Sequence, residues 1–267
     1  MSFILLGILN SQAAAGGGIT SVAGYVILGT AIDKYAFPSD TRSTLANSFA
    51  NSRTFSSSMS NPSVAGYSAG RSGSADVEKV SFPADTISVL GTGLSSARRG
   101  GAGFSNYAVA GYVAGGVAAS AEATTDKFAF PADTRTTLGT GLSVARNFIA
   151  GFFDTGVAGY AAGGTDGTSD YSTVDKFAFP TDSRSTLGTG LSNSTNGLAG
   201  FNNTAVAGYV AGGSSTLTTV DKFAFPSDSR STLATGLSVG RRNLGGFSDT
   251  STAGYAAGGR TSGNQDV

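Results

Sequence analysis

Carboxylates are the groups in this sequence most able to do chemistry, because the 267-residue chain contains neither histidine nor cysteine. Those absences remove the commonest general base, the commonest metal ligand and the strongest nucleophile. The carboxylates form two repeated series. One precedes a lysine in five stretches, at Asp33, Glu78, Asp126, Asp175 and Asp221. The other lies two residues after a proline, at Asp40, Asp85, Asp133, Asp182 and Asp228.

The regular spacing of both series favours structural roles. An acid–lysine pair at one equivalent place in every unit is explained by a solvated rim or by an ion pair between units. An aspartate just after a proline predicts an Asx turn that bonds backbone amides. A calcium site needs more converging oxygens than one aspartate per turn supplies, and a glycosidase needs two carboxylates in one cleft. We therefore predict no catalytic, cofactor-binding or metal-binding residues, and no cofactor.

The carboxylates are positioned by a tandem repeat. Its period of 42 to 49 residues follows from the tyrosine of each Ala-Gly-Tyr triplet, at Tyr25, Tyr67, Tyr112, Tyr160, Tyr209 and Tyr255. The proline of each Phe-Pro pair gives the same period, at Pro38, Pro83, Pro131, Pro180 and Pro226. Units of this length indicate a β-propeller or a helical array. Because the tyrosines recur at one place in the unit, we expect them to pack in the core or between units.

Each unit has the pattern of four strands. In the best-matched copy the second strand covers residues 207–211 and stops at a Gly-Gly pair, and residues 220–225 alternate as a third strand. Pro226 ends that strand, since proline cannot donate to a sheet ladder, and a fourth begins near Ser231. Residues 244–247 are a first strand. Helical periodicity is not sustained, so the sequence predicts an all-β propeller of four-stranded blades.

The number of blades depends on how the ring closes. We predict five, with residues 244–247 joining the strands of the first unit and residues 254–259 left over. The alternative has six, the last built from the C-terminal strand pair together with residues 3–9. Propellers of four to eight blades are known, so both counts are allowed.

Residues 1–18 precede the repeat and are predicted to be an N-terminal docking segment with a glycine hinge at residues 16–18, followed by the propeller domain at 19–267. Completion of a blade of the same propeller is an alternative. A cleaved signal peptide is another, with Ala13 to Ala15 at the cleavage region, although no lysine or arginine precedes the apolar run. That run is too short to insert in a membrane.

The best-matched unit resembles the kelch-type β-propeller family. Tyr-Val-Ala-Gly-Gly at residues 209–213 is similar to that family's strand ending in a double glycine. Residues 220–233 are similar to its next strand, proline turn and outer strand, and Arg241 lies near its arginine after the fourth strand. The usual tryptophan of the outer strand is missing. The resemblance covers most of the chain from Val22 onward and implies a propeller.

The composition points to a function class. Charged residues are only 13% of the chain, with 17 of each sign, which argues against a nucleic-acid partner. The low charge and the Gly-, Ser-, Thr- and Ala-rich repeats resemble virion-associated tail fibre, spike or capsid decoration proteins of tailed phages. That resemblance implies a non-enzymatic protein located on the virion, as a homo-oligomer or in several copies in the assembly. It would be anchored to virion proteins through residues 1–18 and present its loops, such as residues 165–172, to a host-surface glycan or protein.

Two other classes stay open. One is a soluble or secreted, extracellular kelch-like propeller that binds a protein. The other is a propeller enzyme of glycosidase or oxidase type. Kelch-type copper oxidases depend on histidine and a cysteine-modified tyrosine, and this chain has neither histidine nor cysteine.

Overall fold

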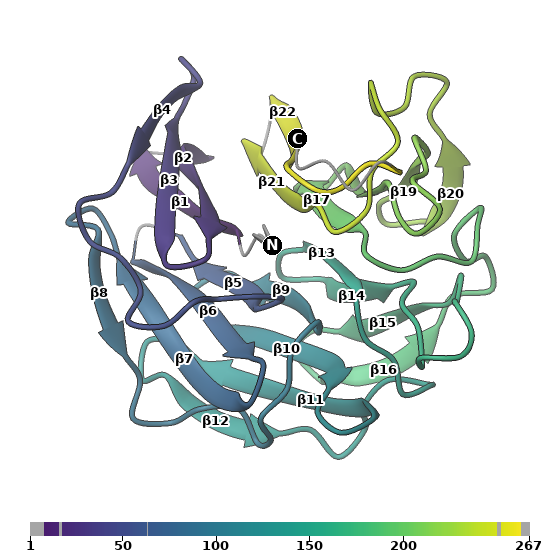
Figure 1. Cartoon of the computed structure of the whole chain (residues 1–267), viewed down its shortest axis with the longest axis horizontal. Coiled ribbons are helices and arrows are strands. Elements are labelled where there is room, and N and C mark those ends of the chain that lie inside the picture. Colours follow the sequence, from purple (N-terminus) through teal and green to yellow (C-terminus); the bar gives the residue numbers. More distant parts are fainter. Residues whose placement is uncertain (1–7, 16–17, 63, 250–251, 263–267) are drawn as a thin grey trace.

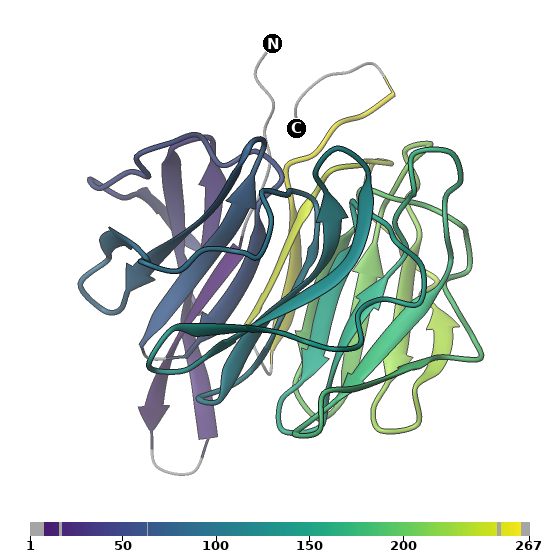
Figure 2. The same ribbon diagram turned by 90° about the horizontal axis from the view of Figure 1, so that it is seen from below.

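The protein is an all-β propeller. The computed structural model describes residues 8–15, 18–62, 64–249 and 252–262. Five four-stranded antiparallel sheets surround a central axis as the five blades, and a two-stranded sheet lies between the last and the first of them (Figure 1). Seen from the side, the blades stand next to one another with loops at both ends (Figure 2). The described residues contain no helix that could span a membrane.

The strands of each blade follow one another in chain order, with the first strand nearest the axis (Figure 1). Blade one contains β1 (Ile8–Ala15), β2 (Gly18–Leu28), β3 (Ala31–Ala36) and β4 (Thr41–Thr44). Blade two contains β5 (Ser57–Asn61), β6 (Ala65–Arg71), β7 (Ser74–Ser81) and β8 (Thr86–Val89). Blade three contains β9 (Ala102–Asn106), β10 (Ala110–Val117), β11 (Ala121–Ala129) and β12 (Thr134–Thr137).

The remaining sheets have the same order. Blade four contains β13 (Ala150–Asp154), β14 (Ala158–Ala162), β15 (Val174–Ala178) and β16 (Ser183–Thr186). Blade five contains β17 (Ala199–Asn203), β18 (Ala207–Ala211), β19 (Val220–Ala224) and β20 (Ser229–Thr232). The half-blade, as we call the two-stranded sheet, contains β21 (Gly245–Asp249) and β22 (Ala253–Ala257).

Five four-stranded blades confirm the preferred count, but both predicted routes of closure are wrong. The first strand of blade one is β1, which pairs with β2 from Ile8 opposite Val26 to Ala15 opposite Gly18. Of the predicted strand at residues 244–247, residues 245–247 pair with β22 and not with blade one. A hairpin between strands that are neighbours in the chain costs little loop-closure entropy, which explains this local pairing. Of the N-terminal alternatives, residues 8–15 therefore belong to a blade, and residues 1–7 lie outside the described residues.

Neighbouring blades interlock through an aromatic ring on the first strand and a glycine on the second. The ring of Phe152 in β13 lies where a Cβ on Gly208 of the next blade would be only 2.0 Å away. The same contact joins Phe104 to Gly159, and Phe247 of the half-blade to Gly24 of blade one. Any side chain at these glycines would overlap the ring. The glycine of the Ala-Gly-Tyr triplet is therefore required for the blades to pack closely.

The repeated tyrosines pack between blades, as the sequence predicts. Five of the six stack on the phenylalanine that precedes the proline of the next blade, with ring centroids 5.1 to 5.6 Å apart, in the pairs Tyr25–Phe82, Tyr67–Phe130, Tyr112–Phe179, Tyr160–Phe225 and Tyr255–Phe37. The first four tyrosines are at most 1% exposed. Tyr209 is half-buried and stacks only on Phe201 of its own blade.

Candidate ligand site in the central channel

The aspartates that follow the prolines are held by the preceding blade. In blade four, the Tyr160 hydroxyl donates to Asp228 Oδ1 at 2.6 Å, and Lys176 Nζ donates to Asp228 Oδ2 at 2.5 Å. We call this arrangement the Tyr–Lys clamp. It recurs as Tyr25 and Lys34 on Asp85, Tyr67 and Lys79 on Asp133, and Tyr112 and Lys127 on Asp182.

The predicted Asx turns are wrong for these aspartates. Their carboxylates accept from the neighbouring blade, and all five residues have φ between 54° and 57°. This left-handed conformation is tolerated by aspartate better than by most residues. The clamp also raises the pKa of Tyr67, Tyr112 and Tyr160, first through burial and then through the bond to the aspartate. Both effects oppose formation of a phenolate, so the tyrosines serve as hydrogen-bond donors.

The aspartates and the glutamate of the third strands are buried structural anchors. In blade three, Asp126 Oδ2 accepts from the amide and hydroxyl of Ser95 at 2.8 and 2.9 Å and from Arg98 Nη2 at 2.9 Å. Burial opposes ionisation of Asp126, but the bonds from Ser95 and Thr137 and the charge of Arg98 outweigh it and lower its pKa. The acid is therefore no part of a solvated rim. Equivalent ion pairs join Arg53 to Glu78 and Arg146 to Asp175.

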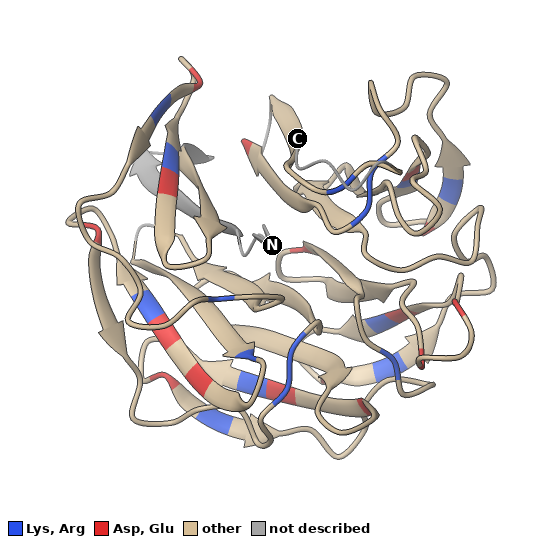
Figure 3. Cartoon of the chain, in the orientation of Figure 1, with Lys and Arg blue, Asp and Glu red and all other residues tan. Residues whose placement is uncertain are grey.

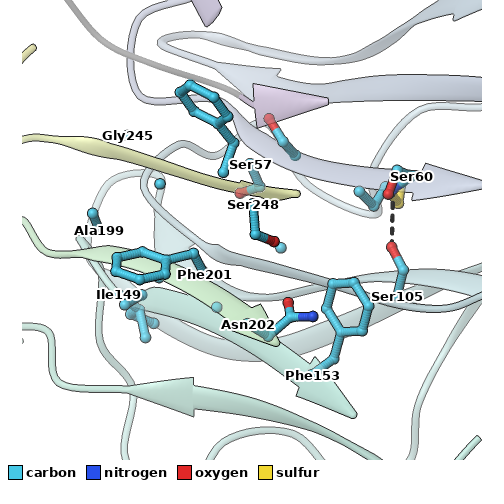
Figure 4. A pocket seen from close by; sticks show the side chains of 18 of the residues that line it. Ser57, Ser60, Ser105, Ile149, Phe153, Ala199, Phe201, Asn202, Gly245 and Ser248 are labelled. Atoms are coloured by element: carbon cyan, nitrogen blue, oxygen red, sulfur yellow. Dashed lines mark hydrogen bonds between the residues drawn. The ribbon is translucent and has the colours of Figure 1, made fainter. Parts of the chain in front are cut away.

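The charged repeats thus lie away from the axis, and Figure 3 shows Lys, Arg, Asp and Glu mainly on the outer strands and their loops. The axis itself holds a cavity of about 140 Å³ between the first strands of blades two to five and the half-blade. Its described lining consists of small, hydroxyl, amide, aliphatic and aromatic residues, with no charged side chain among them. We call this cavity the central channel (Figure 4).

Three buried polar atoms of the central channel have no hydrogen-bond partner among the described residues: Ser56 Oγ, Ser58 Oγ and Asn202 Nδ2. Elsewhere in the channel the Ser105 hydroxyl accepts from the Ser60 amide at 2.9 Å, as the dashed line in Figure 4 shows. Buried polar groups in native proteins are nearly always satisfied by protein, water or ligand. An amide donor and two hydroxyls in the channel wall are therefore left unsatisfied by the described residues.

Aromatic rings accompany these polar atoms. Phe153 and Phe201 line the channel, and Phe55 and Phe148 border an adjoining cavity of about 70 Å³ where the first strands begin. The last two rings meet edge to face at 4.8 Å. Both residues have positive φ, 61° for Phe55 and 54° for Phe148, which is unusual for a bulky residue. Such conformations cluster at functional sites, and this pair marks the end of the channel as a candidate for ligand contact.

Sequence reasoning missed the channel because its lining differs from unit to unit. At one lining position the blades carry Ser60, Ser105, Phe153, Asn202 and Ser248. Comparing the repeats identifies only the residues that are the same in every unit, and these residues pack between the blades. The predicted contact loop, residues 165–172, contributes nothing to the channel lining. Its Asp170 instead accepts from Asn196 and Ser214 at 2.7 and 2.6 Å. Among the described residues there is no group of three or more acidic residues that could hold a metal ion.

No protein-family model and no curated protein sequence matches this chain. Solved structures do match its shape. One of them, "Structure of YjhT", superposes with a TM-score of 0.77 over 98% of this chain and 92% of that chain, at 14% sequence identity. At this low identity the similarity shows the fold alone, and it identifies the protein as one with a β-propeller fold.

Proposed function

We propose that this protein is a non-enzymatic recognition propeller that binds a neutral glycan of a host surface in its central channel. We further propose that it does so as a virion component of a phage, in a tail fibre, spike or capsid decoration. The observation that carries the ligand is the set of unpartnered buried atoms Ser56 Oγ, Ser58 Oγ and Asn202 Nδ2. The virion role rests on the composition and texture of the repeats.

The channel chemistry suits an uncharged, hydroxylated ligand. Sugar hydroxyls both donate and accept, which matches two serine hydroxyls and one amide donor. Phe153 and Phe201 supply apolar surface beside those groups, the usual combination in small-molecule sites. A cavity of about 140 Å³ is small for such a site, so it would take the end of a glycan chain while the rest extended past Phe55 and Phe148.

Attachment of the protein to the particle is part of the same proposal. The sequence assigns this role to residues 1–18, of which residues 8–15 form β1 inside blade one. The attachment is therefore assigned to the residues that precede β1. The proposal includes several copies of the chain on one particle.

A second candidate, a protein-binding propeller, is favoured by a different surface. In blades two to five the turn between the first and second strands carries an exposed valine, 42 to 49% accessible, at Val64, Val109, Val157 and Val206. These turns lie at the same end of the propeller, so the valines form an apolar ring around the axis. Apolar groups arranged around one site are typical of contact surfaces for another protein.

A glycan array tests the ligand. We expect the intact protein to bind a subset of neutral glycans, and Asn202→Leu to abolish that binding because it removes the donor. Asn203→Ala is the matched control, since Asn203 is the next residue of β17 and does not line the central channel. Absence of glycan binding, or equal loss in both variants, would contradict the ligand.

Immunogold electron microscopy tests the virion role separately. We expect an antibody against the chain to label particles at a fixed position and several times per particle. Particles without label, together with capture of a single soluble protein that Val109→Asp and Val157→Asp prevent, would establish the second candidate instead.

A further inference from the structure

The half-blade lacks the two outer strands that every other blade has. In the described part of the chain β22 pairs only with β21. Between β22 and blade five lies a cavity of about 340 Å³, lined by residues that include Phe201, Tyr209, Leu237 and Gly254. In the other blades the third strand pairs with the second strand at the equivalent edge. We call this cavity and the free edge of β22 the hairpin socket.

The first charged feature of the hairpin socket is a Tyr–Lys clamp without its aspartate. Tyr209 and Lys222 are the blade-five equivalents of Tyr160 and Lys176, which hold Asp228. The structure gives the Tyr209 hydroxyl and the Lys222 ammonium no carboxylate partner among the described residues. The hydroxyl of Tyr209 and the ammonium of Lys222 therefore lack the carboxylate that each of the four complete clamps binds.

A second unpaired cation lies beside the half-blade. Arg241 is the equivalent of Arg146, whose Nη2 reaches Asp175 at 2.9 Å in blade four. Arg241 donates only to the carbonyls of Gly258 and Ala256, and its buried Nε has no partner. Burial lowers the pKa of Arg241, and no carboxylate of the described residues opposes that effect. A second carboxylate is thus missing at this place.

The third feature is a carboxylate on blade one, Asp40, which lacks a cationic partner among the described residues. Tyr255 of β22 donates to Asp40 Oδ1 at 2.8 Å, as in the other clamps. The second Asp40 oxygen, which a lysine binds in the complete clamps, has no lysine here among the described residues. The lysine of a clamp always comes from a third strand, which the half-blade lacks.

The aromatic packing of the socket is incomplete in the same way. In blade four, Phe152 and Tyr160 are fully buried under Phe223 and Phe225 of blade five. Their equivalents in blade five, Phe201 and Tyr209, are half-buried and face the socket without such rings. Two aromatic side chains would complete the packing.

We propose that the hairpin socket binds a β-hairpin of a different protein, with the pattern acid-Lys-aromatic-x-Phe-Pro-x-Asp. The acid would bind Arg241, the lysine would bind Asp40, and the aspartate seven residues after the acid would bind Tyr209 and Lys222. The same spacing separates Asp221 from Asp228 in blade five. The backbone of the hairpin would extend the half-blade by strand addition at β22.

The described residues contain no free copy of this hairpin. Each of its five acid-Lys stretches, beginning at Asp33, Glu78, Asp126, Asp175 and Asp221, is already the third strand of its own blade. The proposal concerns a different surface from the central channel and does not depend on the proposed function.

A labelled peptide tests the proposal directly. The probe is Thr-Val-Asp-Lys-Phe-Ala-Phe-Pro-Ser-Asp-Ser-Arg-Ser-Thr-Leu, the sequence of residues 219–233, titrated with the full chain by fluorescence anisotropy. We expect saturable one-to-one binding. The change Asp228→Asn in the peptide should weaken it roughly tenfold, because a charge-assisted bond to the clamp is lost.

Variants of the protein locate the binding. Lys222→Met should weaken binding of the unchanged peptide as much as Asp228→Asn does. It should not alter the circular dichroism of the protein, since Lys222 has no ion-pair partner among the described residues. Lys222→Glu should recover binding only with a peptide that carries Asp228→Lys. Val109→Ala, in the exposed turn between β9 and β10 and outside the lining of the socket, is the control that leaves the clamp intact.

Three results would overturn the proposal. The first is no saturation of the anisotropy, and the second is equal affinity of the unchanged and Asp228→Asn peptides for the protein. The third is self-association of the chain in sedimentation that Lys222→Met prevents, which would make a second copy the occupant.

Discussion

Two interfaces of the propeller carry equivalent tyrosine, lysine and arginine donors but differ in the carboxylates that these donors bind. One lies between blades four and five, and the other lies between blade five and the half-blade. At the first, Tyr160 and Lys176 hold Asp228 of the next blade, and Arg146 holds Asp175 within blade four. In the second, Tyr209, Lys222 and Arg241 have no carboxylate among the described residues. The Tyr–Lys clamps therefore act across blades and the arginine–acid pairs act within one blade, and in both cases a donor without its carboxylate marks a place where a carboxylate would fit.

The largest expected difference concerns the arginines. Arg146→Met removes the partner of Asp175, and both side chains are fully buried. We expect a loss of about 3–5 kcal/mol in the free energy of unfolding, because an uncompensated buried charge remains. Arg241→Met removes only bonds to two carbonyls and should cost about 1 kcal/mol. Urea unfolding of both variants measures this difference. Equal losses in the free energy of unfolding would contradict the inference that Arg241 lacks a carboxylate partner.

The glycines of the second strands give a smaller difference. A Cβ on Gly208 would lie 2.0 Å from the fully buried ring of Phe152, so Gly208→Ala should cost about 1–3 kcal/mol. On Gly254 it would meet Phe201 at 2.3 Å, but that ring is half-buried beside the hairpin socket and can move. Thermal unfolding should therefore show a smaller decrease in Tm for Gly254→Ala. A larger decrease in Tm for Gly254→Ala than for Gly208→Ala would contradict the inference that the Phe201 ring can move into an empty socket.

The tyrosine hydroxyls give a still smaller difference. Tyr160→Phe loses a bond to the Asp228 carboxylate, and we expect a cost of about 1–2 kcal/mol. Tyr209→Phe loses no carboxylate contact and should be close to neutral. The two variants remove the same atom, so urea unfolding measures the bond with little other change. A matching cost at Tyr209 would indicate that its hydroxyl is bonded after all.

The sequence predicted the elements that every unit shares. The alternation around Phe223 and Phe225, the stop at Pro226 and the repeated tyrosines were sufficient for four strands per blade and for packing between blades. It could not predict that Asp228 binds the blade before it, because its Tyr160 partner lies 68 residues away and an Asx turn explains the local pattern equally well. Asn202 and Ser58 were missed because they differ from their equivalents in other blades.

The smallest expected effect is on titration. Burial and the bond to Asp40 raise the pKa of Tyr255 to about 12. Because the folded-state pKa lies above the ordinary value of about 10, this contribution to stability is complete below pH ~10 and is lost as the pH rises towards about 12. Near-ultraviolet absorbance of tyrosinate should show a late-titrating tyrosine that Asp40→Asn shifts to lower pH. An unchanged titration in Asp40→Asn would show that the bond to Asp40 does not raise the pKa of Tyr255.

The most direct measurement of the difference between the two interfaces is amide hydrogen exchange, compared between β18 and β22. Residues 207–211 of β18 are paired on both sides, whereas residues 253–257 of β22 are paired only with β21. We predict that the β22 amides facing away from β21 exchange rapidly, that those of β18 are protected, and that the 219–233 peptide slows the β22 amides alone. Equal protection of the two strands without the peptide would contradict the half-blade and its vacant socket.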